Sequence, residues 1–244
     1  MRIIGVIPAR FQSKRLPGKV LVGILGKPMI QHVWERVKKS KILDDLIIAC
    51  DDKCVLDVAK NFGAKAFLTS KNHPSGTDRI AEVVKNVKTD IVVNIQGDEP
   101  LIHHSVIDAL ASSLKKDKSA VMSTVIKVIT HEEDLDNPNV VKVVIDKNKN
   151  ALYFSRASIA YNRDKRNFKE LIYYKHLGLY AYRRDFLLRL QKMTPSLLEK
   201  TERLEQLRVL EAGYKIKTIL TKRETIGVDT REDLKKVEKF LKQG

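Results

Sequence analysis

The first part of the chain alternates between short apolar runs and amphipathic stretches, and this alternation limits the possible folds more than any other feature. The apolar runs are strand-sized and read RIIGVIPA, DLIIAC, AKAFL and DIVVNIQ. Strands that are apolar on both faces and separated by helices are typical of a parallel sheet covered on two sides. We therefore predict an open, mostly parallel α/β sheet flanked by helices, whose ligands bind beyond the carboxyl ends of the strands.

From about residue 120 the pattern changes to strands with little helix between them, which predicts a strand-rich subordinate lobe with some antiparallel pairing. The runs are AVMSTVIKVI, VVKVVID, ALYFSRA and HLGLYAYR. After them, SLLEKTERLEQLRVLEAG predicts one helix ending at Gly213, and YKIKTIL predicts a further strand. No linker or repeat interrupts the chain, so we predict a single domain over residues 1–244.

Polar residues before the amphipathic stretches predict where the helices begin. Asp51 or Asp52 is placed to cap KCVLDVAKNFG, and Thr77 to cap DRIAEVVKNVK. Near the end of the chain, Thr230 opens the Thr-x-x-Asp pattern of a capping box. These residues give the expected starts of three helices.

The chain is strongly basic, with 46 Lys and Arg against 30 Asp and Glu and a net charge of +16. A basic protein attracts acidic partners such as nucleic acid, anionic lipid or phosphate substrates. Most of the surplus is dispersed, however, and no basic tail or aromatic-interleaved basic run is present. A solvated surface with one local anion site is the favoured interpretation, and a basic nucleic-acid binder is the alternative.

Two further features bear on the compartment. The longest apolar runs are too short to span a membrane, and MRIIGVIPAR is interpreted as a first strand and not a signal peptide. Cys50 and Cys54 have no second cysteine pair or nearby histidine, which argues against a zinc site or a disulfide framework. We therefore expect a cytoplasmic protein.

A cationic loop follows the first strand in the sequence IPARFQSKRLPGKVL. It carries Arg10, Lys14, Arg15 and Lys19 but matches neither the Gly-x-Gly-x-x-Gly fingerprint nor a Walker P-loop. Guanidinium, ammonium and main-chain N–H groups on such a loop can bind a polyphosphate. Its position at a strand end favours an anion site over a merely solvated loop.

Two aspartates are candidates for a metal site, and the position of Asp98 after a strand would present it towards the same rim as Arg10 and Lys19. Asp98 follows the fourth strand in NIQGDEP, and Asp229 precedes the last helix in GVDTRED. Mg²⁺ takes one or two carboxylates together with phosphate oxygens, so these residues beside a polyphosphate site are compatible with Mg²⁺. Alternatively, Asp98 is a turn residue and Asp229 a helix-capping group.

Several motifs together resemble one family, the 3-deoxy-manno-octulosonate (Kdo) cytidylyltransferases or CMP-Kdo synthetases. The resemblance runs from residue 3 to about 235, with Phe11 and Lys14 as departures from the expected Tyr and Thr. CMP-sialic acid synthetases are related, but their N-terminal loop lacks the RLPGK ending. The matching motifs are IPAR-x-x-S-x-RLPGK-x-L, HPSGTDRIAE, NIQGDEP, NPNVVKVVID, ALYFSRA, HLGLYAYR, LEQLRVL and GVDT-x-ED.

The resemblance implies a Rossmann-like nucleotidyltransferase fold and a Mg²⁺-dependent transfer of CMP from CTP to the anomeric hydroxyl of Kdo, releasing pyrophosphate for lipopolysaccharide synthesis. It implies that Asp98 and Asp229 ligate Mg²⁺. The implied catalytic residues are Arg10, Lys19, Asp98 and Asp229. The implied nucleotide-binding residues are Pro8, Ala9, Arg10, Ser13, Arg15, Lys19, Ser75, Arg79 and Gln96.

The same resemblance implies a sugar pocket and a homodimer. The implied sugar-binding residues are Gln96, Arg156, His176, Tyr180, Glu205 and Gln206. Taken singly, His176 and Tyr180 are more often core or sheet-packing residues. Glu205 and Gln206 are equally compatible with the polar face of a helix, and Arg156 with a surface strand. The resemblance divides the chain into a nucleotide-binding part (about 1–120), a sugar-binding and dimerisation part (about 121–220) and a C-terminal strand and helix (about 221–244). Another acid sugar, such as sialic acid, remains an alternative acceptor.

Overall fold

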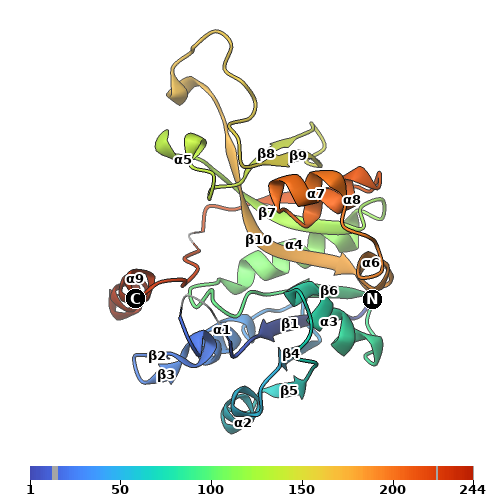
Figure 1. The fold of residues 1–244 in the computed structure, drawn as a ribbon, viewed down its shortest axis with the longest axis vertical. Helices are drawn as coiled ribbons and strands as arrows, with labels where there is room; N and C mark the ends of the chain where they lie inside the picture. Colours follow the sequence, from blue (N-terminus) through green and yellow to red (C-terminus); the bar gives the residue numbers. More distant parts are fainter. Residues whose placement is uncertain (13–15, 224, 244) are drawn as a thin grey trace.

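The computed structural model describes residues 1–12, 16–223 and 225–243, and one large sheet runs through this part of the chain (Figure 1). In spatial order its main strands are β11 (Ile216–Leu220), β7 (Met122–Val128), β10 (Tyr174–Arg183), β6 (Ile91–Asn94), β1 (Ile3–Ala9), β4 (Asp45–Cys50) and β5 (Lys65–Leu68). The hairpin of β8 (Lys142–Ile145) and β9 (Ala151–Ser155) joins it through β10, and β2 (Gly23–Ile24) and β3 (Lys27–Pro28) form a small separate sheet.

Along the main path of the sheet, from β11 to β5, the pairing is mostly parallel. β1 pairs in parallel with β4 and β6, β4 with β5, and β11 with β7. β10 runs antiparallel between β6 and β7. The predicted fold class is confirmed, and so is the antiparallel pairing expected in the second half of the chain.

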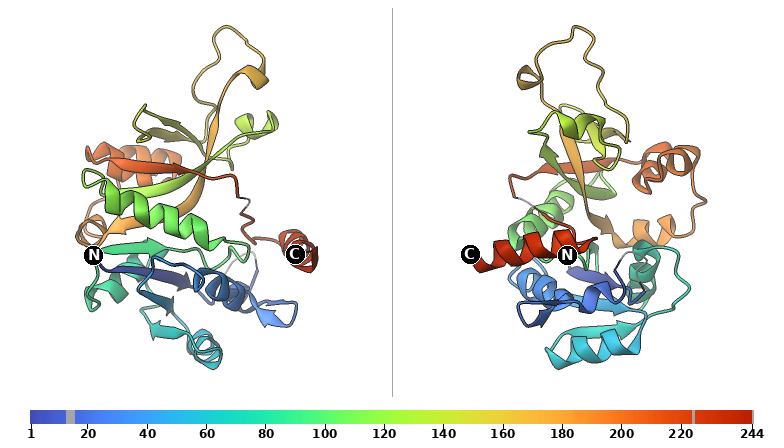
Figure 2. Two further views of the ribbon diagram at one scale, coloured as in Figure 1. Left: turned by 180° about the vertical axis from the view of Figure 1, so that it is seen from behind. Right: turned by 60° about the vertical axis from the view of Figure 1, so that its left-hand side comes forward.

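Helices cover both faces of the sheet, as Figure 2 shows from two sides, so the inner strands are apolar on both faces. One face is covered by α1 (Met29–Val37), α2 (Lys53–Asn61) and α4 (His104–Lys116). The other is covered by α3 (Gly76–Lys85), α6 (Arg184–Leu190) and α8 (Gln206–Glu211), with the short helix α7 (Leu197–Glu202) beside α8.

The helix starts agree with the sequence in two of three cases. Asp52 caps α2 by accepting from the Cys54 N–H at 2.9 Å. Thr230 and Asp233 form the expected reciprocal bonds before α9 (Arg231–Gln243). Thr77 was the wrong choice of cap for α3, because Ser75 accepts from the Asp78 N–H and Thr77 already lies in the first turn. The Thr77 side chain is therefore free for another contact.

The single helix predicted to end at Gly213 is wrong as well. The chain forms α7 and α8, separated at Arg203, whose φ of 53° is left-handed and ends α7. The break places Leu204 in the apolar core and lets Glu205 contact Thr77 of α3. Tertiary burial outweighs helix propensity here.

The C-terminal segment returns to the first part of the chain. Val228 and Val237 pack with Ile24, Met29 and Leu101 in a small separate apolar cluster. This packing fixes α9 beside the segment that contains β2 and β3 (Figure 1). It brings residues near 229 to the carboxyl edge of β1.

Two other segments complete the described fold. Residues 156–173, which we call the arm, leave the sheet after β9, include the 3₁₀ turn η2 (Phe168–Glu170) and return as β10 (Figure 1). The short helix α5 (Glu133–Asp136) lies between β7 and β8, and the 3₁₀ turn η1 (Lys19–Leu21) follows β1. Within the described residues, no helix combines the length and the apolar character needed to cross a membrane.

Candidate active site

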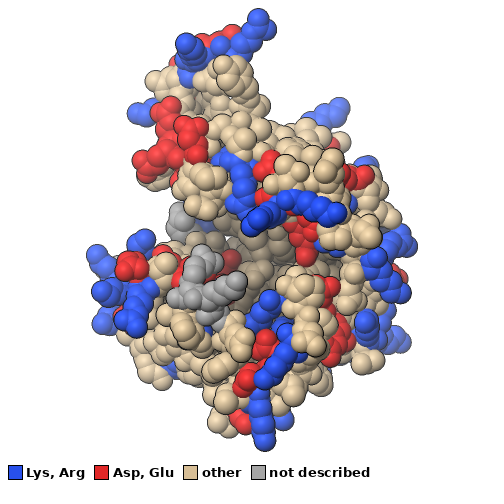
Figure 3. Space-filling model, in the orientation of Figure 1, with Lys and Arg blue, Asp and Glu red and all other residues tan. Residues whose placement is uncertain are grey.

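A cleft of about 250 Å³ opens at the carboxyl ends of β1 and β6. In the space-filling view the molecule is hollowed between the part holding β1 and the part holding β10, and side chains of both charges border the hollow (Figure 3). The cleft is lined by Pro8, Arg10, Gln12, Lys19, Val20, Gly76, Gln96, Gly97 and Asp98. The structure thus places five of the sequence-predicted residues in one cavity: Pro8, Arg10, Lys19, Gln96 and Asp98.

The Lys19 ammonium joins the two candidate metal ligands. It donates to a carboxylate oxygen of Asp98 and, at 3.0 Å, to Oδ1 of Asp229. Its side chain is 14% exposed. Burial opposes the charge of Lys19, but the two carboxylates outweigh it and raise the pKa of the ammonium. Lys19 is therefore charged, and its positive charge lies between two negative ones.

A main-chain contact explains how Asp229 reaches this place from 210 residues away in sequence. The Val228 N–H donates to the Asp98 carbonyl at 2.9 Å, and the Val228 side chain is buried in the apolar cluster described above. The Asp229 carboxylate follows directly and lies beside that of Asp98. The loop after β6 and the segment before α9 are thus fixed together.

These two carboxylates fit a divalent cation. They approach one position from separate segments, and that position already holds a cation, the Lys19 ammonium. Carboxylate oxygens are the donors that Mg²⁺ prefers, and two of them with substrate phosphates are its usual set. No group of three or more potential metal ligands occurs among the residues the structure describes, so the remaining ligands would come from substrate or water.

Glu99, the next residue after Asp98, differs from Asp98 in that its carboxyl group is buried. Burial, with a smaller effect of the Asp98 charge, raises the pKa of Glu99 to about 8. Glu99 is therefore mostly neutral at pH 7, although it adjoins Asp98 in sequence. Asp98, in contrast, already binds the Lys19 ammonium.

Close main-chain packing shapes the floor of the cleft. A Cβ added to Gly97 would meet the Pro8 carbonyl oxygen at 2.9 Å, so only glycine fits without a shift of the backbone. A Cβ on Gly76 would lie 3.4 Å from Cγ of Pro8. On the rim, the Arg10 guanidinium donates to the His73 carbonyl at 3.0 Å. Pro8 thus lies between two glycines in the lining of the cleft.

Other predicted nucleotide-binding residues lie around this floor. Ala9 is buried in β1, and the Ser75 hydroxyl caps α3 and donates to Asp78. The Arg79 side chain is fully buried and donates to Asp51 Oδ2 at 3.0 Å and to the Ser70 carbonyl at 3.2 Å. Ser13 and Arg15 lie outside the described residues.

Contacts made by β10 lead from the cleft to the predicted sugar residues. The Gln96 amide donates to the Gly178 carbonyl of β10 at 3.1 Å. Further along β10, the Tyr180 hydroxyl donates to Gln206 Oε1 at 3.3 Å. The ring of His176 lies 5.4 Å from that of Tyr180. Four of the six predicted sugar residues are therefore linked through β10.

The chemistry of His176 follows from its surroundings. Its Nε2 lies 2.8 Å from the Thr124 hydroxyl. Burial lowers the pKa of His176 to about 3, so the ring is neutral at physiological pH. The ring is suited to hydrogen bonding and not to carrying charge. Burial likewise raises the pKa of Tyr180, which keeps its hydroxyl protonated.

The remaining two sugar residues lie on other segments. Glu205 accepts from the Thr77 hydroxyl at 2.7 Å, and burial raises the pKa of its carboxyl group. Arg156 follows β9, and its guanidinium donates to the carbonyls of Glu202 and Pro138, each at 2.8 Å. Its partners are carbonyls and not carboxylates, so its charge remains available to an acidic ligand.

Sequence reasoning missed two residues that hold the site. Lys142 is fully buried in β8, and its ammonium donates to the carbonyls of Asn137 at 2.9 Å and Arg156 at 2.6 Å. A lysine inside the apolar run VVKVVID was the available signal. Thr77, interpreted as a cap, has a tertiary role instead. No local pattern distinguishes that role.

The fold and the cleft together are those of a nucleotide-binding α/β protein. The cytidylyltransferase family model matches residues 4–219. The 3-deoxy-manno-octulosonate cytidylyltransferase of Geotalea uraniireducens is 48% identical, with 100% of each chain covered, and that of Syntrophobacter fumaroxidans is 50% identical, with 100% of this chain and 98% of the relative covered. The chain belongs to the cytidylyltransferase family.

Solved structures agree with this assignment. The structure of a CMP:2-keto-3-deoxy-manno-octonic acid synthetase complexed with CTP is 42% identical, covers 100% of this chain and 99% of its own, and has a TM-score of 0.94. A cytidylyltransferase from Leptospira borgpetersenii is 17% identical, covers 100% and 88%, and has a TM-score of 0.67. The second likeness shows the fold alone.

The buried Arg79–Asp51 pair predicts a loss of stability on substitution. Arg79→Leu leaves the Asp51 carboxylate, whose side chain is 12% exposed, without its cation. We expect the free energy of unfolding to fall by about 3–5 kcal/mol in urea denaturation at pH 7. Arg10→Leu, on the cleft rim, is the matched control and should cost less than about 1 kcal/mol. Equal effects of the two variants would contradict a structural role for Arg79.

Proposed function

We propose that this chain transfers CMP from CTP to the anomeric hydroxyl of Kdo, forming CMP-Kdo and pyrophosphate and activating Kdo for lipopolysaccharide synthesis. The observation that carries the proposal is the cleft in which Lys19, Asp98 and Asp229 meet beside Arg10. Support comes from full-length relatives with this activity in their names and from the similar structure solved with CTP.

The residues of the cleft match the needs of nucleotidyl transfer. Phosphoryl chemistry asks for in-line positioning and cancellation of charge on phosphate oxygens, with little covalent work by the protein. Arg10 and Lys19 supply positive charge for the triphosphate, with Ser13 and Arg15 of the same loop as further proposed contacts. The floor formed by Pro8, Gly76 and Gly97 would receive the cytosine.

We assign Mg²⁺ to Asp98 and Asp229. When bound, the ion would neutralise phosphate charge and polarise the α-phosphate. The Val228–Asp98 main-chain hydrogen bond fixes the two segments whose carboxylates would hold the ion, and the Lys19 ammonium donates to both carboxylates.

The acceptor pocket is assigned to the residues linked through β10 and α8. Kdo is an acid sugar with many hydroxyls, so it needs one cation and several neutral hydrogen-bonding groups. Arg156 provides the cation, and the neutral His176 and Tyr180 provide the hydrogen bonds. The others, Gln96, Glu205 and Gln206, lie on the segments that join the cleft to α8.

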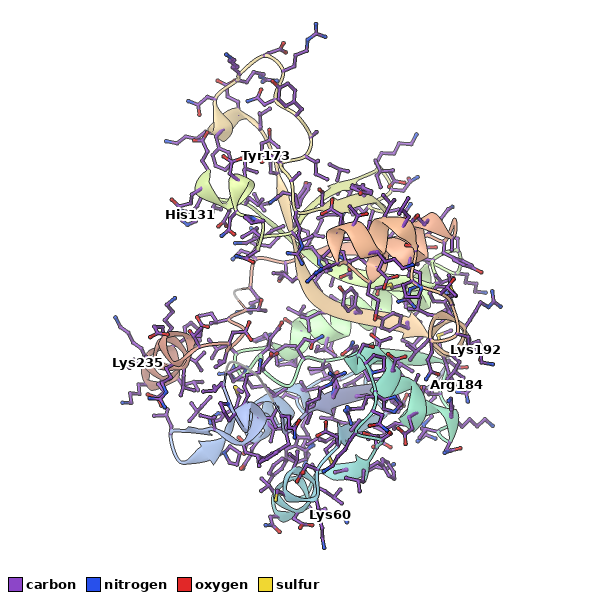
Figure 4. All side chains as sticks on the ribbon, viewed as in Figure 1. Lys60, His131, Tyr173, Arg184, Lys192 and Lys235 are labelled. Carbon is purple, nitrogen blue, oxygen red and sulfur yellow. The ribbon has the colours of Figure 1, made fainter. Side chains whose placement is uncertain are left out.

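We also propose that the protein is a cytoplasmic homodimer. The arm exposes Tyr161 (86%) and Ile172 (69%), which line a cleft of about 400 Å³ against β8 and β10. Tyr173, labelled in Figure 4, lies where the arm rejoins β10. Large exposed apolar side chains of this kind suit an interface with a second copy. Both cysteines are free thiols, as suits a reducing compartment.

Pyrophosphate release tests the activity. CTP, UTP, ATP and GTP are supplied with Kdo, with sialic acid or with no sugar, in Mg²⁺ or in EDTA. We expect release only where CTP, Kdo and Mg²⁺ are present together. Release with CTP and sialic acid but not with Kdo would identify sialic acid as the acceptor. Release in EDTA would contradict the assignment of Mg²⁺. No release with any pair would contradict the function, and salt-dependent nucleic-acid binding would then be measured.

Replacement of the first metal ligand tests the site. Asp98→Ala should keep the fold and lower kcat by about a hundredfold or more, because charge on the transferring phosphate is no longer balanced. The measurement is steady-state kinetics with saturating CTP and Kdo, beside far-UV circular dichroism. Asp57→Ala, on the exposed face of α2, is the control and should keep full activity. An active Asp98→Ala enzyme would overturn this assignment.

Light scattering after size exclusion tests the homodimer. The wild type should elute at about twice the chain mass of 27.8 kDa. The double variant Tyr161→Ser, Ile172→Ser should shift towards the monomer, because it removes exposed apolar surface from the arm. Leu68→Ser removes a similarly exposed side chain on β5 and should remain dimeric. A wild-type monomer would contradict the proposal outright.

A further inference from the structure

Thr77 makes a contact that its position in sequence does not explain. Its side chain is only 8% exposed, and its hydroxyl donates to Oε1 of Glu205 at 2.7 Å across 128 residues of sequence. Ser75 already caps the helix, so the hydroxyl is not needed for the first turn of α3. The contact is therefore tertiary, and it joins α3 to the residue that precedes α8.

The turn that carries Thr77 also forms part of the nucleotide cleft. Gly76, the first residue of α3, lines the cleft and packs close to Pro8. Thr77 follows it and faces Glu205. One turn of helix thus touches the cleft with one residue and the proposed acceptor pocket with the next. A ligand that contacts Gly76 acts on the same rigid turn that holds Glu205.

The Glu205 side is equally constrained. The Glu205 carboxyl is largely buried, which raises its pKa, while the Thr77 hydrogen bond and the Arg208 charge favour its ionised form. The adjacent Gln206 accepts from Tyr180, and its own Nε2 is buried without a hydrogen-bond partner among the described atoms. A buried carboxylate that accepts a hydrogen bond has a fixed orientation, and loss of that bond is costly.

We propose that Thr77 is a positioning residue for the acceptor sugar: it fixes the Glu205 carboxylate and links it to the nucleotide cleft through Gly76. The inference rests on the proposed function, because Glu205 is assigned there to the Kdo pocket. Thr77 does not line the cleft, and we assign it no direct contact with the reacting groups of either substrate. Its effect appears in acceptor binding and in the linkage between the two substrates, which is reciprocal in free energy.

Steady-state kinetics on three variants test the positioning. Thr77→Val keeps the shape and removes the hydroxyl, and we expect the KM for Kdo to rise about tenfold with the KM for CTP within about twofold. Thr77→Ser restores the hydroxyl and should return the KM for Kdo close to wild type. Thr89→Val removes an equally buried hydroxyl (8% exposed), which donates to the carbonyls of Arg2 and Ile91 at the far end of β6, and should leave both KM values unchanged.

A double-mutant cycle identifies the group through which Thr77 acts. If the path runs through Glu205, Thr77→Val added to Glu205→Gln should raise the KM for Kdo by less than about twofold beyond Glu205→Gln alone. Additive effects would overturn the proposal, as would equal changes in both KM values or a failure of Thr77→Ser to rescue. The melting temperatures of all variants are also compared. A similar fall in melting temperature for Thr77→Val and Thr77→Ser would indicate a folding defect and would count against the proposal.

Calorimetry tests the linkage separately. Binding of Kdo is measured with and without a nonhydrolysable α,β-methylene CTP analogue. In the wild type the analogue should tighten Kdo binding about fivefold, and in Thr77→Val this effect should disappear. Retention of the effect in Thr77→Val would overturn the linkage. A wild type that fails to turn over CTP and Kdo overturns the proposed function itself, whereas an active wild type with a normal Thr77→Val variant overturns only the inference about Thr77.

Discussion

The contact on which the site depends is the bridge from the Lys19 ammonium to the carboxylates of Asp98 and Asp229. It gathers the loop after β1, the loop after β6 and the segment before α9. Without the positive charge, two half-exposed carboxylates would repel each other at short range. The apolar cluster around Val228 and the Val228–Asp98 main-chain hydrogen bond also hold these three segments together. The electrostatic contacts and the apolar packing therefore favour the same arrangement of these three segments.

Much of the fold follows from the sequence because its signals are local. Apolar runs of strand length separated by amphipathic helices require a covered parallel sheet, and Asp52 and Thr230 cap where their chemistry predicts. The two errors share a cause. At Thr77 and at Arg203 a distant contact decides the conformation: Thr77 faces Glu205, and the chain turns at Arg203 so that Leu204 becomes buried. Such contacts leave no pattern in a short window of sequence.

The site was predictable to the extent that its residues belong to linear motifs. Asp98 and Lys19 follow strand ends, and the topology of a parallel sheet brings such ends together. Asp229 could be placed with them only through the family resemblance, since its approach depends on the packing of α9. The burial of Arg79 and Lys142, both fully buried, could not be predicted, because a charged residue in the sequence gives no sign that it lies in the interior.

The position of β10 has a consequence for any attempt to divide the molecule. β10 begins after the arm, yet it lies between β6 and β7, which both precede it in the chain. A cut in the arm would leave one fragment holding Lys19 and Asp98, and another holding Asp229 and the inner strand of the sheet. Neither fragment has a complete core. The first lacks β10 between β6 and β7, and the second lacks β7 between β11 and β10. The strands before and after the arm are interleaved in one sheet, so no single break in the chain separates the proposed nucleotide side from the proposed acceptor side.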